Sequence, residues 1–116
     1  MITMYGISNC DTIKKAKKWL EQHQIEYQFH DYKKSSVDAA FLEDMIKQHG
    51  VDTVVNKRGT TFRKLTDEQK ESMTQDSAVP LLIDNPSMIK RPILVHQGGS
   101  HIGFKADDYA EIFNLA

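Results

Sequence analysis

The chain has 116 residues, 40% of them hydrophobic and 27% charged, which suits one globular domain with a single core. Its net charge of -1 gives no bulk attraction to nucleic acid or anionic membranes, and its single cysteine excludes both an internal disulfide and a zinc site of several thiolates. No apolar run approaches the ~20 residues that span a bilayer, and no secretory signal pattern begins the sequence, so we expect a cytoplasmic protein with a reduced thiol.

The first half of the chain predicts two strands and two helices. Residues 2–7 form a short apolar strand, and Ile13, Ala16 and Leu20 then recur at helical spacing within residues 11–22. Residues 27–32 alternate like a second strand, and the strand–helix–strand order predicts a parallel pair with a right-handed crossover. The next helix would begin at a capping box in residues 35–38 and end at Gly50.

The second half predicts further helices and then a hairpin. Residues 66–69 form a second candidate capping box, and Asp76 is the expected cap of another helix, provided that Pro80 lies in its first turn. Two apolar runs, 93–96 and 101–104, flank Gly98 and Gly99 and predict a hairpin, after which a last helix would cover the sheet with Tyr109. We therefore expect an α/β fold in one domain, residues 1–116. It would be a thioredoxin-like mixed sheet with a helical insertion at about residues 36–88, between the second and third strands.

Cys10 lies where the first strand should meet the first helix. At a helix N-terminus a thiol meets unpaired backbone N–H groups and the positive end of the helix dipole, and both favour the thiolate. The same N–H groups can hold a small oxyanion, and Lys14 and Lys15 could assist. Cys10 is thus a candidate nucleophile. The alternatives are a buried cysteine that serves as a small hydrophobe, and lysines that form a solvated helix face.

Two basic segments are candidate anion sites. Arg91 precedes Pro92 just before the third strand, where a thioredoxin-like fold would bring it close to the cysteine turn, and the bond between them is a candidate for a cis peptide. Its planar guanidinium suits an oxyanion or a carboxylate. Residues 56–65 form a basic loop that contains Arg58 but lacks the spacing of a phosphate-binding loop. The alternatives are a surface arginine and a solvated connector.

The five histidines carry no metal signal. None of them has a zinc-helix spacing, and no cysteine or carboxylate cluster accompanies them, so we expect no metal site. His96 and His101 would face each other across the predicted hairpin.

Three segments in this order resemble one family: YGISNCDT at residues 5–12, NKRGTTFRKL at residues 56–65 and IKRPILV at residues 89–95. The chain resembles the arsenate reductase (ArsC)/Spx family over essentially its whole length, and within it the YffB-like branch of small thiol reductases. The resemblance implies a thioredoxin-like sheet with a helical insertion. It also implies no bound cofactor, with glutathione as a co-substrate.

In the arsenate reductases of this family, the first-turn cysteine attacks arsenate, and a glutathione adduct is then resolved by external thiol and glutaredoxin. Cys10 matches that cysteine, and Arg91 matches the arginine that contacts the oxyanion. Those enzymes carry two further arginines, at positions where this chain has Asn56 and Phe104-Lys105. These departures favour a glutathione-dependent monothiol reductase, with Cys10 as nucleophile, over an arsenate reductase.

The partners expected for that reductase are glutathione or a glutathionylated substrate, and glutaredoxin. The residues expected to bind the substrate or an anion are Asn9, Lys14, Arg58, Arg91 and Lys105.

A regulator is the competing reading of the same resemblance. Spx-type members of the family bind RNA polymerase and control transcription, usually through a Cys-x-x-Cys redox switch. The second position of that switch is Ile13 here, so this chain cannot form the internal disulfide. An Spx-like regulator that binds RNA polymerase remains the alternative to an enzyme, and a binding module without turnover is a third possibility.

Overall fold

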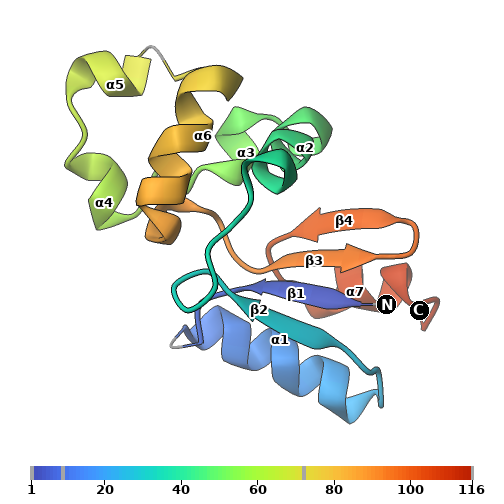
Figure 1. Cartoon of the computed structure of the whole chain (residues 1–116). Helices are drawn as coiled ribbons and strands as arrows, with labels where there is room; N and C mark the ends of the chain where they lie inside the picture. The colour runs from blue at the N-terminus through green and yellow to red at the C-terminus, as the bar shows by residue number, and fades with distance from the viewer. Residues whose placement is uncertain (1, 9, 72, 116) are drawn as a thin grey trace. The chain divides into compact units, whose positions relative to one another are not determined.

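The computed structural model describes residues 2–8, 10–71 and 73–115, which form two compact units (Figure 1). The first unit comprises Met1–Asp31 and Arg91–Ala116, and it holds the whole sheet. The second unit, Tyr32–Lys90, holds the helices that follow the second strand. That the two units act as one domain stays a prediction.

The sheet has four strands in the order β2-β1-β3-β4. Their bounds are Thr3–Gly6 for β1, Gln28–Asp31 for β2, Ile93–His96 for β3 and Gly99–Ile102 for β4. β1 pairs in parallel with β2 and antiparallel with β3, while β3 and β4 form an antiparallel hairpin. The predicted parallel pair, hairpin and thioredoxin-like mixed sheet are therefore confirmed, with the helical insertion between β2 and β3. The second strand of the hairpin lies two residues earlier than the predicted run 101–104, because Gly99 belongs to β4 rather than to the turn.

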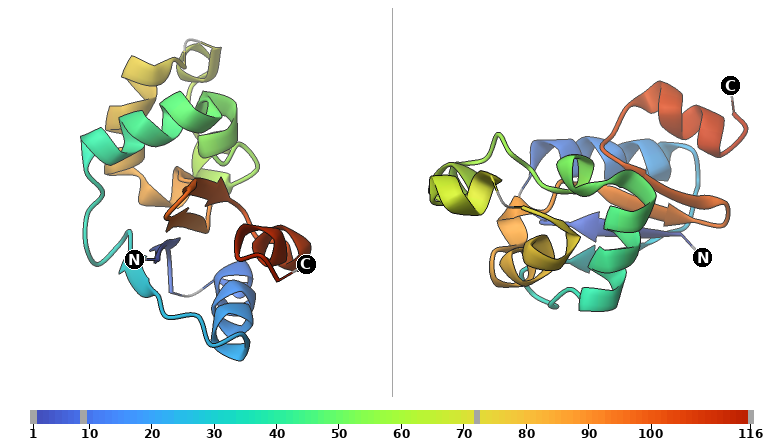
Figure 2. Two further views of the ribbon diagram at one scale, coloured as in Figure 1. Left: turned by 90° about the vertical axis from the view of Figure 1, so that its right-hand side faces the viewer. Right: turned by 90° about the horizontal axis from the view of Figure 1, so that it is seen from above.

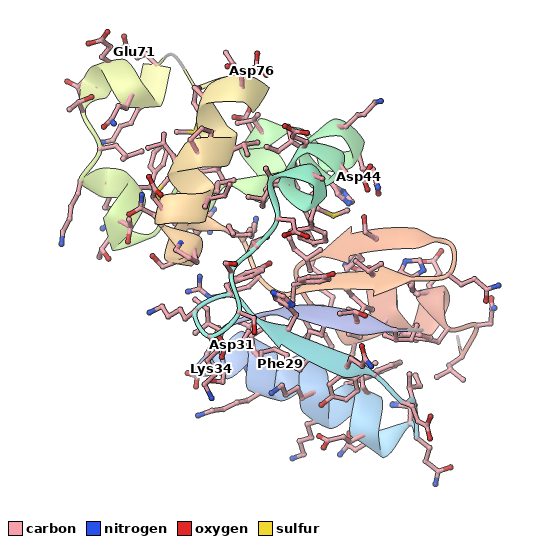
Figure 3. The ribbon with its side chains drawn as sticks, viewed as in Figure 1. Phe29, Asp31, Lys34, Asp44, Glu71 and Asp76 are labelled. Carbon is pink, nitrogen blue, oxygen red and sulfur yellow. The ribbon has the colours of Figure 1, made fainter. Side chains whose placement is uncertain are left out.

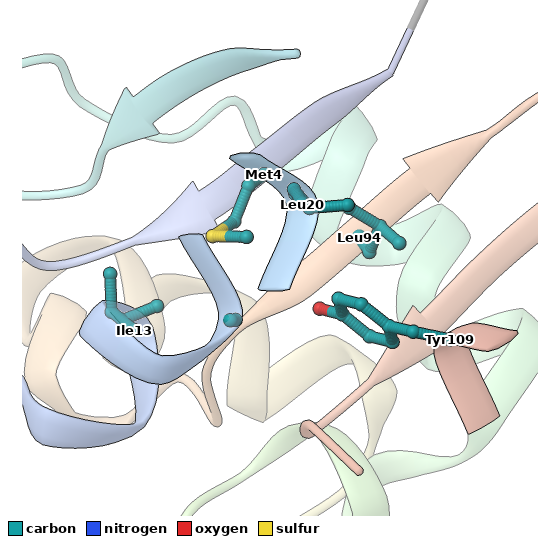
Figure 4. Close-up of a cluster of buried hydrophobic side chains, with 6 residues drawn as sticks. Met4, Ile13, Leu20, Leu94 and Tyr109 are labelled. Atoms are coloured by element: carbon teal, nitrogen blue, oxygen red, sulfur yellow. The ribbon is translucent and has the colours of Figure 1, made fainter. Parts of the chain in front are cut away.

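Two helices of the first unit cover one face of this sheet (Figure 2). Helix α1 spans Asp11–Gln22, as predicted from its apolar spacing, and α7 spans Ala106–Ile112. A cluster of buried side chains joins them to the two central strands β1 and β3 (Figure 4). Burial of one such side chain stabilises a fold by roughly 1.5–3 kcal/mol, so this cluster fixes α1 against β1. Its members are Met4, Ile13, Ala16, Leu20, Leu94 and Tyr109.

The second unit is built from short helices. They are α2 (Ala39–His49), α3 (Val51–Val54), α4 (Thr60–Arg63), α5 (Asp67–Glu71), α6 (Gln75–Asp84) and the 3-10 helix η1 (Pro86–Met88). Helix α2 packs against α3 and α6. It ends at Gly50, as predicted, where φ is +89° and glycine is favoured.

The helix caps correct part of the sequence prediction. The box at residues 66–69 is confirmed: the Thr66 N–H donates to Gln69 Oε1 at 3.0 Å, and the Gln69 N–H donates to Thr66 Oγ1 at 3.1 Å. The box expected at residues 35–38 is wrong, because α2 begins only at Ala39, with Asp38 as its N-cap residue and no side-chain cap hydrogen bond.

The cap predicted for the next helix is also wrong. Thr74, not Asp76, caps α6, and Ser77 completes a capping box with it. Because this box starts the helix earlier, Asp76 falls in the first turn (Figure 3), where its charge suits the helix dipole. Pro80 then lies inside the helix rather than in its first turn.

Candidate active site

Cys10 stands between β1 and α1, as the N-cap residue of the helix. Its backbone is extended, with φ -141° and ψ 130°, and its carbonyl accepts the first helical hydrogen bond, from the Lys14 N–H at 3.0 Å. The side chain is partly buried and packs against the core cluster beneath α1. The sulfur is therefore held at the positive end of a helix while part of it stays accessible to a reactant.

The environment of Cys10 favours the thiolate. Burial raises the pKa of the thiol, because a charged sulfur loses contact with water. The Ile13 N–H, the Arg91 side chain and the Thr12 N–H lie close enough to favour the deprotonated sulfur and so lower the pKa, as does the positive charge of Arg91, although the Cys10 side chain forms no well-aligned cap hydrogen bond with the helix. The lowering effects prevail, so the pKa of Cys10 lies below its ordinary value.

Arg91 reaches the sulfur from the segment before β3. The Arg91-Pro92 peptide is cis, and the Pro92 carbonyl accepts a hydrogen bond from the Gly103 N–H at 2.8 Å. This bond ties the segment to the residue that follows β4. A guanidinium that already touches the sulfur can also present N–H groups to a carboxylate or an oxyanion bound there.

Other residues proposed for the site have different places. Lys14 and Lys15 are exposed on α1 and are not among the groups that lower the pKa of Cys10. Lys105 is the exposed N-cap residue of α7. Asn9 lies outside the residues that the structure describes. The structure thus brings together Cys10 and Arg91 among the expected site residues.

Arg58 belongs to the second unit, where it lines a basic cavity of about 280 Å³. Lys57 and Lys90 line the same cavity, and Lys57 forms an ion pair with Asp52. The backbone segments that line this cavity are held together by an isolated β-bridge between Val55 and Ile89 and by backbone hydrogen bonds on either side of that bridge. The side chains give this cavity a positive balance, which suits an anion.

The sequence predicted that backbone N–H groups at the start of the helix favour the thiolate of Cys10, but not which ones, and it suggested that two lysines assist. The N–H groups that lower the pKa of Cys10 are those of Ile13 and Thr12. Those are the second and third residues of α1, so an N-cap assignment for Cys10 is the signal that could have identified them.

His96 and His101 are not directly opposite each other in the hairpin, since His96 pairs with Gly99 and His101 with Leu94. The two histidines lie diagonally across the hairpin, and burial together with the charge of His101 lowers the pKa of His96.

Among the described residues, no group of three or more His, Cys, Asp or Glu side chains could hold a metal ion. Within the described ranges, no helix is both long and apolar enough to cross a bilayer.

Comparison with known proteins agrees with this fold. An uncharacterised protein of Haemophilus influenzae is 47% identical over 113 residues, which cover 97% of this chain and 99% of the relative. The structure of the YFFB protein is 46% identical, with a TM-score of 0.91 over 96% of this chain and 97% of that one. The solution structure of an arsenate reductase (ArsC) related protein from Brucella melitensis is also 46% identical, with a TM-score of 0.77 over 98% and 95% of the two chains.

More distant similarity extends to regulators. The global transcriptional regulator Spx of Streptococcus pyogenes is 28% identical over 110 residues, which cover 93% of this chain and 81% of the relative. The model of the ArsC family matches residues 5–112, a range that contains Cys10, Arg58, Arg91 and Lys105. This chain belongs to the ArsC family.

Proposed function

We propose that this protein is a glutathione-dependent thiol reductase that uses Cys10 as its single nucleophile. The observation that supports this best is the convergence of the Arg91 side chain and the first-turn N–H groups of α1 on one sulfur, which lowers the pKa of that thiol. The thiolate is the reactive form of cysteine, so a lowered pKa raises the reactive fraction near neutral pH. The likeness to an arsenate reductase related protein adds support for chemistry at this position.

The proposed reaction is a pair of thiol–disulfide exchanges. In the first, the Cys10 thiolate attacks the glutathione sulfur of a glutathionylated substrate. A Cys10–glutathione disulfide forms, and the substrate leaves as its thiolate. In the second, the thiolate of a free glutathione attacks the glutathione sulfur of that adduct, which releases oxidised glutathione and regenerates the Cys10 thiolate. Glutaredoxin would act at this second step. Arg91 would hold a carboxylate of glutathione beside the sulfur.

Arsenate is a poorer candidate substrate. Its transition state spreads negative charge over several oxygens, and loss of one preorganised donor typically costs about 10²–10³ in turnover. Arginines of the arsenate enzymes are replaced here by Asn56 and by Phe104-Lys105. Lysine keeps a charge but lacks the two-pronged geometry of arginine. A sulfur–sulfur exchange needs less oxyanion stabilisation, because it expels a thiolate.

The test combines mass spectrometry with a coupled assay. After exposure to oxidised glutathione, the wild-type protein should carry one glutathione on Cys10, which free glutathione removes, and Cys10→Ser should carry none. In a glutathione- and glutaredoxin-coupled assay, reduction of a glutathionylated peptide should depend on Cys10 and exceed reduction of arsenate. Efficient arsenate turnover without Cys10-dependent reduction of the peptide would refute the proposal.

A second candidate function is Spx-like regulation through RNA polymerase, which the similarity to Spx of Streptococcus pyogenes favours. Ile13 stands where the usual switch has its second cysteine, so such a regulator would have to sense redox state through Cys10 alone or not at all. Co-elution of the purified chain with purified RNA polymerase on a sizing column distinguishes the regulator from the reductase. Co-elution favours the regulator, and its absence together with a glutathione adduct favours the reductase.

A further inference from the structure

We infer that Gly6 is a positioning residue for Cys10: the lack of a Cβ at the end of β1 lets the Ile13 side chain lie against the strand and so fixes the first turn of α1 beside the sulfur. This inference rests on the proposed function, in which Cys10 reacts as a thiolate. Gly6 does not touch the substrate in this account. It acts through Ile13.

Space, rather than backbone conformation, demands glycine at this position. A Cβ placed on Gly6 would lie 2.3 Å from Ile13 Cδ1 and 3.1 Å from Ile13 Cγ1. Non-bonded carbon atoms are optimally separated by about 3.5–4.0 Å, so Ile13 would have to move. The left-handed φ values among the glycines of the described residues occur elsewhere, at Gly50, Gly99 and Gly103.

Ile13 has little room in which to move. Its side chain is fully buried in the core cluster, to which Ala16 also belongs. Figure 4 shows Ile13 in this cluster together with Met4. Phe29 packs against the same cluster, and its Cε1 atom would make an ordinary contact with the added Cβ at 3.6 Å. Interiors packed this closely transmit a displacement rather than absorb it. A methyl group at position 6 would therefore displace the start of α1 along with the side chain.

The start of α1 is the part of the helix that acts on Cys10. Cys10 is the N-cap residue and Ile13 the third residue of α1, so the Ile13 N–H lies in the turn that faces the sulfur. Among the groups that lower the pKa of the thiol the Ile13 N–H is the foremost, and the Thr12 N–H acts in the same direction. One residue thus has two roles: the side chain of Ile13 packs against Gly6, and its backbone N–H stabilises the thiolate. Displacing the side chain of Ile13 therefore weakens the stabilisation of the thiolate by the Ile13 N–H.

The experiment measures the rate at which iodoacetamide alkylates Cys10 as a function of pH. In Gly6→Ala the midpoint of the profile should move to higher pH, and the rate at neutral pH should fall by about two- to fivefold, the effect of weakening a helix N-terminal interaction. The double variant Gly6→Ala/Ile13→Val lacks the Cδ1 atom that would lie 2.3 Å from the new methyl group and keeps only the milder 3.1 Å contact, so its profile should move most of the way back to that of the wild type. Gly98→Ala is the matched control, because a Cβ there meets nothing nearer than His96 Cε1 at 3.6 Å.

Several outcomes would overturn the inference. They are a wild-type profile in folded Gly6→Ala, a double variant that keeps the shifted profile, and a double variant that does not fold although it has the extra space. If Gly6→Ala alone fails to fold by circular dichroism, a folded double variant with a profile close to that of the wild type still supports the inference. The pH profile of alkylation of the wild-type protein distinguishes a failure of the proposed function from a failure of the inference about Gly6. A wild-type thiol with an ordinary pKa defeats the proposed function, whereas a low wild-type pKa that Gly6→Ala leaves unchanged defeats the inference alone.

Discussion

The side chain of Arg91 donates a hydrogen bond to the sulfur of Cys10, although the two residues stand near opposite ends of the chain. The sheet register explains their meeting. β1 and β3 are antiparallel neighbours in which Tyr5 pairs with Ile93, so the chain leaves β1 beside the point where it reaches β3. Cys10 follows β1 and Arg91 precedes β3. The antiparallel pairing therefore builds the reactive centre from two distant segments.

The first prediction concerns pH. The pKa of Cys10 in the folded protein lies below its ordinary value, so alkylation should already be fast at a pH where a free cysteine, with a pKa of about 8.5, is mostly protonated. Between the folded and unfolded pKa values the native state binds fewer protons than the unfolded state. The free energy of unfolding, measured relative to Cys10→Ser, should therefore rise with pH across that window and decline as pH falls through the folded pKa. A difference that stays flat with pH would contradict the lowered pKa.

The second prediction concerns Arg91. Arg91→Lys keeps a positive charge but loses the planar fork, so glutathione should bind more weakly by roughly 1.5–3 kcal/mol if a charged hydrogen bond is lost from a sheltered site. Calorimetry would measure the affinity. Lys18→Gln is the control, since it removes a positive charge from an exposed position on α1. Equal affinities of wild type and Arg91→Lys for glutathione would show that Arg91 does not contribute to glutathione binding.

The third prediction concerns Tyr109, which is fully buried in the core cluster. Its hydroxyl has no hydrogen-bond partner among the described residues, and burial raises the pKa of this phenol. A buried polar group without a partner costs about 1–3 kcal/mol, so Tyr109→Phe should unfold at a urea concentration equal to or higher than wild type. Tyr109→Ala should instead lose about 3–5 kcal/mol, because it removes a packed ring. Clear destabilisation by Tyr109→Phe would show that the hydroxyl is satisfied after all.

The fourth prediction distinguishes the two residues that compete as the cap of α6. Thr74→Ala removes the side chain that accepts from the Ser77 N–H at 3.3 Å, and it should lower the free energy of unfolding by about 0.5–2 kcal/mol. Asp76→Ala removes only a favourable charge from the first turn and should cost about 0.3–1 kcal/mol. Urea denaturation of both variants tests the order. A larger loss of unfolding free energy in Asp76→Ala than in Thr74→Ala would indicate that Asp76 is the cap of α6, as the sequence predicted.

The sequence by itself determined the elements with strong local signals. Helix α1 was predicted with its observed bounds, because Ile13, Ala16 and Leu20 follow one face of a helix. Gly50 and the Thr66–Gln69 box were likewise recognisable, since capping chemistry depends on residues only a few positions apart. The parallel pairing of β1 with β2 and the hairpin of β3 and β4 were predicted from short apolar runs and from the strand–helix–strand order. Cys10 was predicted as a candidate nucleophile from its place at a strand-to-helix turn, which the structure places at the N-cap of α1.

Only the tertiary structure decided what surrounds the sulfur. Lys14 is near Cys10 in sequence, yet it points to solvent on an exposed helix position, whereas Arg91 arrives through the antiparallel pairing of β1 with β3. Likewise, nothing in the sequence indicates that Gly6 leaves room for Ile13, because that contact depends on how closely α1 packs on the strand. Local patterns fix secondary structure through nearest neighbours. The reactivity of a thiol depends on fields and contacts within a few ångströms, and those come from residues that the fold alone brings together.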